Sequence, residues 1–378
     1  MNKLFLLSFV GILCLSDASY FLRFLPEQPK ETIKEELVRP VLEGGNLRPF
    51  IDNFTEYYDK TFPGRYSLAQ LVQTIKKDVF DSSPVNEVII GKDGWLYQGA
   101  GTMYAIQDYL CFEPFTEEQI TVIKQVVTEN KQFIENINAR YLVVIIPDKA
   151  HVYPEFLPDR LVKSDLVSRR EQLFSILKQL NVNYIYLKDS LIANKHKGQL
   201  YYKTDTHWNN LGAAIGYNAI ISVLNDSSLK PLDINELNTD TTFFTFYGDI
   251  GSMTFLGDLA KLEKSYPYQL VLKKPELCQA ERYIATANGT GDFFMCTSNP
   301  EKKKKIVLFR DSFSGVYSAY LPQNFGQTTL FWTYKLQKKY LIEQQPDYVV
   351  HILAERFIKE AFHDNTFNFL FKDHGTFE

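Results

Sequence analysis

The most regular part of the chain alternates apolar runs with segments of helical periodicity. Residues 141–146 form an unbroken apolar run and residues 184–187 a second one, and such runs are typical of strands buried on both faces. Further strands are predicted at 306–309, 328–332 and 348–353, with helical spacing over 166–180 and 211–224. Alternating strands and helices predict an α/β fold, in which a parallel sheet carries helices on both faces.

Two local signals precede this alternation. Residues 88–90 and 95–97 are apolar and flank Gly91-Lys92-Asp93-Gly94, which predicts a β-hairpin because an Asp-Gly turn tolerates positive φ. Thr116 is followed three residues later by Gln119, the pattern of a capping box at the start of a helix.

The alternation is interrupted between residues 226 and about 300, where Asn, Asp, Thr and Gly accumulate. We interpret this stretch as an irregular insertion. The predicted organisation is therefore a leader at residues 1–18 and one domain over residues 30–378 that contains the insertion.

The first residues have the layout of an export signal. Met1-Asn2-Lys3 is followed by the uncharged apolar run 4–16 and by Ser16-Asp17-Ala18, and this run is short for a membrane span. The pattern predicts a periplasmic or other extracytoplasmic protein. Because apolar residues resume at 20–25, an uncleaved inner-membrane anchor stays an open alternative.

Overall charge and composition exclude several classes of protein. Lys and Arg number 41 against 45 Asp and Glu, a net charge of -4, so no concentrated basic surface for nucleic acid is predicted. A hydrophobic content of 45% is enough for a large core. The aromatic content of 15% is unusually high and points to flat stacking surfaces.

The four cysteines fit an exported protein. Cleavage after Ala18 would remove Cys14, and Cys278 and Cys296 close a short loop that we interpret as a structural disulfide. Cys111 is then left over as a packed thiol. No Cys/His pair has zinc spacing, so no metal site is predicted.

Two polar motifs have residue types that suit acyl transfer: one directly follows a predicted strand, and the other lies in a predicted loop before a helix. Ser312, in Asp311-Ser312, follows strand 306–309, where a strand-to-helix turn exposes a serine and aims backbone N–H groups at an oxyanion. Asp205 precedes His207 by two residues, so the carboxylate can hold one imidazole nitrogen while the other accepts a proton. The alternatives are a plain N-cap for Ser312 and a loop-anchoring role for His207.

Two other groups at strand ends compete for a role. His151 follows Asp148 by three residues and is an alternative base, although Lys149 and Tyr153-Pro154 favour a loop on the substrate side. Glu355-Arg356 follows the last strand, either as a structural salt bridge or as a binding site for a charged substrate group.

Several motifs recur together in one known family. They are Phe62-Pro63-Gly64-Arg65, residues 91–97, Ile146-Pro147-Asp148-Lys149 with Tyr153-Pro154-Glu155, residues 204–209 (Thr-Asp-Thr-His-Trp-Asn), Asp311-Ser312-Phe313 and Glu355-Arg356. In this order, over roughly residues 45–360, the chain resembles the alginate O-acetyltransferase family of AlgJ and AlgX. Arg310 departs from the pattern, because a glycine commonly precedes Asp-Ser there.

The resemblance implies a fold and a reaction. It implies an SGNH-hydrolase-like domain whose sheet is topologically permuted, since the Asp/His motif precedes the Ser motif. It assigns Ser312 as nucleophile, His207 as base and Asp205 as orienting acid, without a cofactor. The implied reaction moves acetyl groups onto hydroxyls of an exported polysaccharide through an acetyl-serine. The implied acetyl donor is an integral-membrane acyl-transfer protein.

Residues around this triad are candidates for substrate binding. Trp208, Trp332 and Tyr334 are candidates for stacking on the polymer at the Ser312 end of the sheet, with core packing as the favoured alternative for each of them. Lys149 and Arg356 are candidates for contacts with the polymer. Two alternatives remain: a polysaccharide O-acetylesterase, in which water replaces the sugar, and a non-catalytic exopolysaccharide-binding or assembly protein. The non-catalytic alternative predicts that Ser312 and His207 lie far apart.

Overall fold

The computed structural model describes residues 40–41, 47–61, 75–76, 86–100, 105–234, 237–239, 244–246, 248–253, 263–265, 268–270, 276–277 and 294–364. The chain divides into two compact units. One comprises residues 1–85 and 254–257, and the other comprises residues 86–253 and 258–378. In the first unit, helix α2 (Leu47–Thr61) carries neighbouring Phe50 and Phe54 rings 5.6 Å apart, four residues from each other on one helix face.

The second unit is built on a seven-stranded sheet of order β4-β3-β13-β11-β12-β10-β9. The strands are β4 (Asn183–Tyr186), β3 (Arg140–Ile146), β13 (Tyr348–Ala354), β11 (Lys305–Arg310), β12 (Gln327–Phe331), β10 (Phe294–Ser298) and β9 (Glu276–Leu277). The first five pair in parallel, β10 is antiparallel to β12, and β9 is antiparallel to β10.

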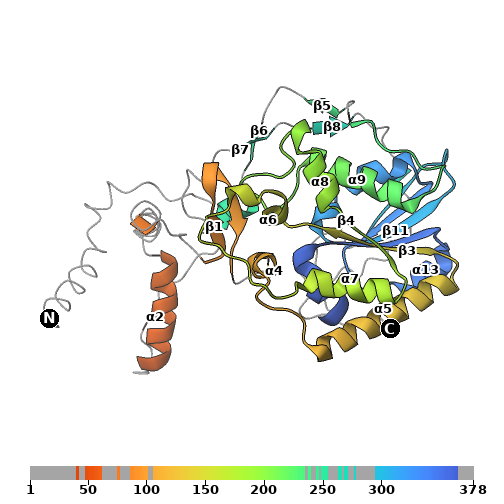
Figure 1. Ribbon diagram of the computed structural model, residues 1–378. Helices are drawn as coiled ribbons and strands as arrows, with labels where there is room; N and C mark the ends of the chain where they lie inside the picture. The colour runs from red at the N-terminus through yellow and green to blue at the C-terminus, as the bar shows by residue number, and fades with distance from the viewer. Residues whose placement is uncertain are drawn as a thin grey trace, which may run out of the picture. The chain divides into compact units, whose positions relative to one another are not determined.

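Helices cover both faces of this sheet (Figure 1). The described α-helices of the second unit are α4 (Ala105–Leu110), α5 (Glu117–Asn136), α6 (Lys149–Val152), α7 (Arg169–Gln179), α8 (Lys188–Ala193), α9 (Asn210–Leu224), α10 (Asp249–Met253), α12 (Tyr317–Tyr320) and α13 (Lys338–Gln344). Short 3-10 helices span Lys92–Gly94, Pro154–Phe156, Lys195–Lys197, Ser312–Ser314, Leu321–Gln323 and Glu355–Phe357, and a π-helix spans Glu360–Asp364. In Figure 1, α5 and α7 lie below the sheet, and α8 and α9 lie above it. The predicted α/β class with a parallel sheet is confirmed.

The central strands are buried as their apolar runs predict. All seven residues of β13 and the last six of β3 are buried, because each strand pairs on both sides and is covered by helices on both faces. The same prediction for residues 184–187 is wrong for most of that run. Residues 184–186 are only half-buried at the sheet edge, where β4 pairs with β3 alone.

The local signals are also confirmed. Strands β1 (Val88–Ile90) and β2 (Leu96–Gln98) form the hairpin, with Asp93 at φ 54° and Gly94 at φ 77° in the turn. Thr116 and Gln119 form the reciprocal capping box that starts α5. A second capping box, between Ser168 and Glu171, starts α7, so that helix begins slightly later than its periodicity suggests.

The predicted irregular insertion is only partly irregular. It contains two short antiparallel pairs, β5 (Leu237–Thr239) with β8 (Tyr268–Leu270) and β6 (Phe244–Phe246) with β7 (Glu263–Ser265). Its last segment, β10, belongs to the main sheet, where Cys296 pairs with Thr329. The insertion therefore ends earlier than residue 300. The sequence did not reveal β10, because this five-residue strand, Phe-Met-Cys-Thr-Ser, has no long apolar run.

Several predictions concern residues outside the described part of the chain. The leader 1–18, the Phe62–Arg65 turn, Cys14 and Cys278 lie there. Cys296 is disulfide-bonded, and Cys111 is a free, half-buried thiol whose pKa is raised chiefly by burial. Among the helices of the described segments, none has the length and apolar character to cross a bilayer.

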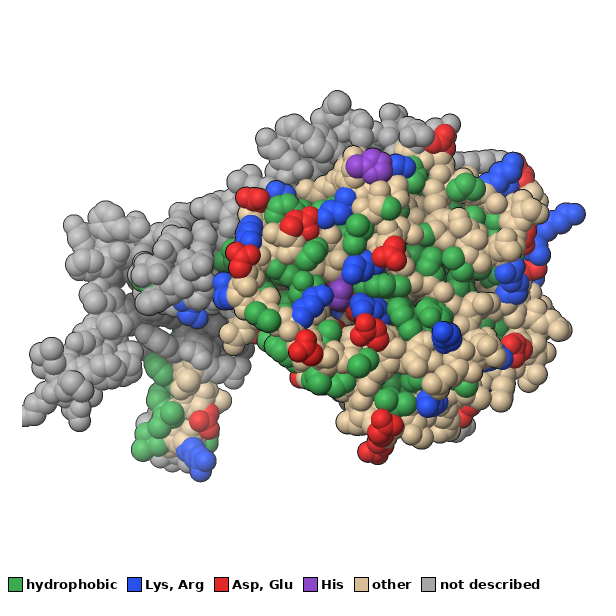
Figure 2. All heavy atoms as spheres, viewed as in Figure 1, with side chains coloured by type: hydrophobic (Ala, Val, Ile, Leu, Met, Phe, Trp, Pro, Cys, Tyr) green, Lys and Arg blue, Asp and Glu red, His purple; other side chains and the backbone are tan. Residues whose placement is uncertain are grey.

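The surface of the described residues mixes both signs of charge. On the face in Figure 2, Lys and Arg side chains alternate with Asp and Glu, with hydrophobic side chains between them. This face carries no broad field of one sign, as the near-balanced composition indicates.

Candidate active site

Ser312 lies at the carboxyl end of a central strand. It follows β11 directly, opens the 3-10 helix Ser312–Ser314 and is exposed. Because ligands of parallel α/β sheets bind outside the carboxyl ends of the strands, this is the edge where chemistry is expected.

A buried carboxylate holds the turn that carries Ser312. Asp311 is 1% exposed, and one of its oxygens accepts the backbone N–H of Phe313 at 2.9 Å. The other oxygen accepts the Tyr334 hydroxyl at 2.8 Å and the Ala354 backbone N–H at 2.7 Å. Asp311 therefore ties the turn to the ends of two neighbouring strands. The backbone N–H groups of this turn were expected to bind an oxyanion. The Phe313 N–H is not available for that role, because it already donates to the Asp311 carboxylate.

Two further side chains support the same turn. The indole N–H of Trp208 donates to the Phe313 carbonyl at 2.7 Å. Arg310 donates to the Asp311 carbonyl at 3.1 Å and places its guanidinium 4.7 Å from the Trp332 ring centre. Arg310 thus braces the turn from the end of β11.

His207 connects Ser312 to a carboxylate. Its Nε2 lies 2.7 Å from Ser312 Oγ, and its Nδ1 lies 2.7 Å from Asp205 Oδ1. Asp205 Oδ1 also accepts the His207 backbone N–H at 2.8 Å, so the two residues are locked together locally. Burial raises the pKa of Asp205, but the hydrogen bond and charge of His207 and backbone N–H groups outweigh it and hold that pKa below its usual value.

Lys149 fixes the loop that carries Asp205. Its ammonium donates to the carbonyls of Tyr202, Lys203 and Asp205 at 3.0, 2.9 and 2.8 Å, and the residue is only 4% exposed. The predicted contact between Lys149 and substrate is therefore replaced by a structural role, because all three ammonium donors are directed at backbone oxygens.

Asp249, at the start of α10, is a member of the site that the sequence does not reveal. Its backbone N–H donates to Asp205 Oδ2 at 2.9 Å, and its carboxylate accepts the Thr206 backbone N–H at 2.6 Å and hydroxyl at 2.5 Å. The preceding Gly248 permits this contact, since a Cβ there would lie 2.1 Å from the Thr204 carbonyl oxygen.

Asp205, His207 and Asp249 also have the spacing of a metal site, with one ligand atom of each within 4.8 Å of the others. These atoms are already joined by hydrogen bonds: Asp205 to His207, and Asp249 to Thr206. We therefore treat the group as a hydrogen-bonded network that orients the imidazole.

The predicted stacking aromatics support the site from within. Trp208 is 4% and Tyr334 2% exposed, so neither offers a face to a polymer, and both instead hold the Ser312 turn through their hydrogen bonds. Trp332 is half-buried and carries Arg310 on its ring. Many of the aromatic side chains pack in the core. The largest fully buried side chains include Tyr97, Tyr201, Tyr217, Tyr317, Phe309 and Phe325.

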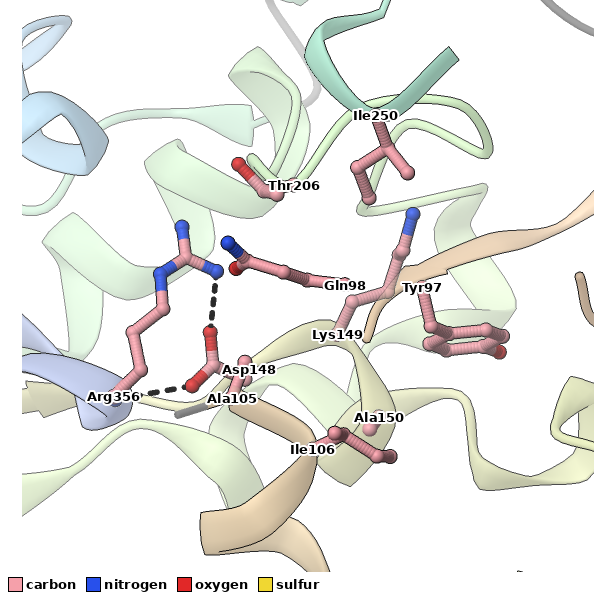
Figure 3. Close-up of a pocket in the computed structure, with 10 residues that line it drawn as sticks. All are labelled: Tyr97, Gln98, Ala105, Ile106, Asp148, Lys149, Ala150, Thr206, Ile250 and Arg356. Carbon is pink, nitrogen blue, oxygen red and sulfur yellow. Dashed lines mark hydrogen bonds and ion pairs between the residues drawn. The ribbon is translucent and has the colours of Figure 1, made fainter. Parts of the chain in front are cut away.

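Glu355 and Arg356 do not form a salt bridge with each other. Arg356 pairs with Asp148 at 2.8 Å, and its backbone N–H donates to the same carboxylate at 3.1 Å. Burial raises the pKa of Asp148 to about 6, although Arg356 counteracts it. Figure 3 shows the ion pair of Asp148 and Arg356. The Arg356 guanidinium lies 5.0 Å from the Phe313 ring centre, which places this ion pair beside the Ser312 turn.

The rival base, His151, is elsewhere. It is 6% exposed, and its Nδ1 lies 3.4 Å from Glu355 Oε2. Glu355 in turn accepts from Arg170 and Tyr186 at 3.0 and 2.7 Å. The structure places His207, and not His151, against Ser312.

The comparisons with known proteins define a class. A family model described as the SGNH hydrolase-like domain of the acetyltransferase AlgX matches residues 88–330. This is more than half of the chain, which therefore belongs to this family.

The relatives similar in sequence include several proteins named AlgJ. The probable alginate O-acetylase AlgJ of Pseudomonas putida is 24% identical over 262 residues, covering 68% of this chain and 62% of that protein. The protein of the same name from Pseudomonas aeruginosa is 25% identical over 228 residues, covering 60% and 54%. The chain thus matches less than two thirds of the length of these relatives.

Solved structures resemble the fold. The structure of Bacillus cereus PatB1 with a sulfonyl adduct has a TM-score of 0.51 at 18% identity, covering 72% of this chain and 97% of that one. The O-acetyltransferase domain of Pseudomonas putida AlgJ has a TM-score of 0.47 at 18% identity, covering 72% and 92%.

Proposed function

We propose that this protein is an O-acetyltransferase that acetylates hydroxyl groups of an exported polysaccharide through the triad Ser312, His207 and Asp205. One observation carries the proposal: the His207 imidazole lies 2.7 Å from Ser312 Oγ on one side and 2.7 Å from Asp205 on the other. An exposed serine joined to an oriented imidazole is the arrangement that nucleophilic acyl transfer requires. Membership in an acetyltransferase family supports the choice of acyl group.

The first half of the reaction forms an acetyl-serine. His207 Nε2 takes the Ser312 hydroxyl proton while Oγ bonds to the carbonyl carbon of the acetyl donor. The tetrahedral intermediate then collapses, its bond to the leaving group breaks, and the leaving group takes the proton from the imidazolium. Asp205 keeps Nδ1 protonated and stabilises the positive imidazolium at 2.7 Å.

The second half repeats these steps with a sugar hydroxyl. His207 removes the hydroxyl proton, the sugar oxygen attacks the acetyl-serine, and the proton returns to Ser312 Oγ as the ester bond breaks. The backbone N–H of Ser312, the first residue of its 3-10 helix, is our candidate oxyanion donor, because first-turn N–H groups have no partner within the helix.

The location and partners of the reaction are part of the proposal. The leader pattern at residues 1–18 supports export, and the curated relatives are named for acetylation of alginate, a polysaccharide. Acetyl-CoA is not available outside the cytoplasm, so an integral-membrane acyl-transfer protein is the proposed acetyl donor.

An acetylesterase is the second candidate function. The His207 side chain is 28% exposed and Ser312 is exposed, so water can reach an acetyl-serine as readily as a sugar can. The non-catalytic alternative loses its main support, because it predicts a wide separation between Ser312 and His207.

The deciding experiment incubates the purified protein with 4-nitrophenyl acetate, with and without alginate oligosaccharides. We expect mass spectrometry to find one acetyl group on Ser312 and acetylated oligosaccharide as product, and both to vanish in Ser312→Ala. Ser314→Ala is the matched control, since Ser314 lies on the same turn but is fully buried, and its hydroxyl has no hydrogen-bond partner among the described residues. The proposal would be refuted if the wild type formed no acetyl-enzyme and Ser312→Ala kept full activity. If the wild type hydrolyses the acetyl-enzyme faster than it transfers the acetyl group to oligosaccharide, the esterase is favoured.

A further inference from the structure

A small pocket lies beside the triad. Its lining comes from β2, α4, α6 with the preceding Asp148, the Asp205 loop, α10 and the 3-10 helix that follows β13 (Figure 3). The polar part consists of Gln98, Asp148, Lys149, Thr206 and Arg356, whereas Ile106 and Ile250 are among the apolar walls. The Lys149 ammonium already donates to three backbone carbonyls. Thr206 precedes the base His207, so the pocket borders the catalytic loop directly.

Gln98 presents an unsatisfied group to this pocket. The residue is 6% exposed, and its side-chain oxygen is buried without a hydrogen-bond partner among the described residues. Buried polar groups in folded proteins are almost always paired, so an exception that lines a pocket is readily explained by a ligand donor. The group that would satisfy a carbonyl oxygen is an O–H or N–H.

Arg356 complements Gln98 across the pocket. In Figure 3 the Gln98 amide and the Arg356 guanidinium are directed toward each other. Arg356 Nε is also buried without a partner among the described residues, while the Arg356 guanidinium pairs with Asp148 at 2.8 Å. The pair of Gln98 and Arg356 thus combines a free acceptor with N–H donors.

These features favour a hydroxyl group as ligand. A hydroxyl both donates and accepts, so it can satisfy the Gln98 oxygen and accept from an amide or guanidinium N–H. A carboxylate or phosphate has no proton to donate to the Gln98 oxygen. The pocket volume of about 20 Å³ leaves room for a single small polar group such as a hydroxyl.

We propose that the Gln98 pocket, formed by β2, α4, α6 and α10, is an acceptor subsite that binds one hydroxyl group of a sugar. The assignment rests on the proposed acetyl transfer and specifies how its acceptor is held. The subsite adjoins the base through Thr206, and it adjoins the nucleophile turn through Arg356, whose guanidinium lies 5.0 Å from the Phe313 ring centre. Gln98 is a substrate-binding residue that takes no part in forming the acetyl-enzyme.

The test replaces Gln98 by an isosteric apolar side chain. For Gln98→Met we expect acetyl-enzyme formation from 4-nitrophenyl acetate to stay within about twofold, because no acceptor takes part in it. We expect the KM for an alginate hexasaccharide or for cellohexaose to rise about tenfold, as expected for loss of one hydrogen bond to a buried group. Gln98→Ala is the second variant if Gln98→Met does not fold.

A matched control lies nearby. Gln107, on α4, also has a buried side-chain oxygen without a partner among the described residues, but it does not line the pocket. Gln107→Met should leave both measurements unchanged.

The outcomes separate the two proposals. The subsite is overturned if the KM for the acceptor is unchanged in both Gln98 variants. It is also overturned if acetyl-enzyme forms more slowly in Gln98→Met, or if the wild-type acetyl-enzyme transfers no acetyl group to either hexasaccharide. In each of these cases acetyl-Ser312 still forms and the triad stands. If no acetyl-Ser312 forms in the wild type, the proposed function itself fails.

Discussion

Two histidines lie near carboxylates at the carboxyl edge of the sheet, and only one faces a nucleophile. His207 is 28% exposed at its side chain and contacts both Asp205 and Ser312 at 2.7 Å. The His151 side chain is only 5% exposed, and its Nδ1 lies 3.4 Å from Glu355 Oε2. The centres of the His151 and Tyr109 rings are 5.0 Å apart. The difference shows that a carboxylate neighbour does not by itself make a histidine a base.

Electrostatics separates the two sites further. Burial, then the charges of Arg170, Lys163 and Lys188, lower the pKa of His151 well below its ordinary value, while burial raises the pKa of Glu355 against the effect of Arg170. In contrast, the pKa of Asp205 is lowered overall by its bonds to His207 and to backbone N–H groups. The His151 site favours neutral forms, and the His207 site favours the charged carboxylate that stabilises an imidazolium.

The largest expected effect comes from exchanging the two histidines for glutamine. His207→Gln should lower kcat for acetyl-ester turnover by at least about 1000-fold, because it removes the base. His151→Gln should stay within about threefold. Steady-state kinetics of both variants, with thermal unfolding as a check of folding, test this pair. Equal losses would remove the distinction between the sites.

The carboxylates provide the next comparison. Asp205→Asn should lower kcat by about 100- to 10 000-fold, since an amide neither fixes the imidazole tautomer nor stabilises its charge. Glu355→Gln should leave kcat within about threefold. Burst kinetics with 4-nitrophenyl acetate report on the acylation step, and an acylation rate in Asp205→Asn equal to wild type would argue against the orienting role.

A smaller effect is expected for Asp249. In Asp249→Ala the backbone N–H that reaches Asp205 remains, but the two hydrogen bonds to Thr206 are lost. We expect kcat to fall about tenfold with little change in KM, and Asn to restore part of it. The exposed Asp165, changed to Ala, is the control. A change in KM alone would assign Asp249 to substrate binding instead.

The smallest effect concerns stability and pH. A histidine whose pKa is lowered in the folded state takes up protons more readily when unfolded, so its contribution to stability is present above about pH 6.5 and declines as the pH falls. The free energy of unfolding of wild type, relative to His151→Gln, should therefore decrease from pH 7 toward pH 4. Urea unfolding at several pH values measures this difference, and a difference independent of pH would mean that His151 is not buried in its neutral form.

Much of the fold was predictable because its signals are local. The Asp93-Gly94 turn and the Thr116 capping box depend on residues within a few positions of each other. The central strands were predicted from their unbroken apolar runs. The rule that ligands bind at the carboxyl ends of parallel strands applies to Ser312, which follows β11. It does not apply to His207, whose loop comes after α8 and the 3-10 helix Lys195–Lys197, so the meeting of the two residues, 105 positions apart, was predictable only from the family resemblance.

Other parts of the site depend on contacts that no local pattern encodes. Asp249 lies 44 residues from Asp205 in a stretch without periodicity, so nothing in the sequence links the two. Lys149 gives no sign that three backbone carbonyls surround its ammonium. Trp208 and Tyr334 were candidates for sugar stacking, with core packing as the alternative, and both are buried. Residue type alone does not reveal which aromatic side chains pack in the core.

The anchoring of the Ser312 turn has a consequence for how this protein can diversify. Asp311, Trp208 and Arg310 hold the turn from the sheet and from the start of α9, whereas the Gln98 pocket is built mainly by the hairpin, α4 and α10. Under the proposed function, substitutions on the hairpin and α4 would alter which sugar is accepted while the reacting hydroxyl stays in place. Arg356 is the exception, because it serves both parts, and it marks the position where a change of specificity would also cost rate.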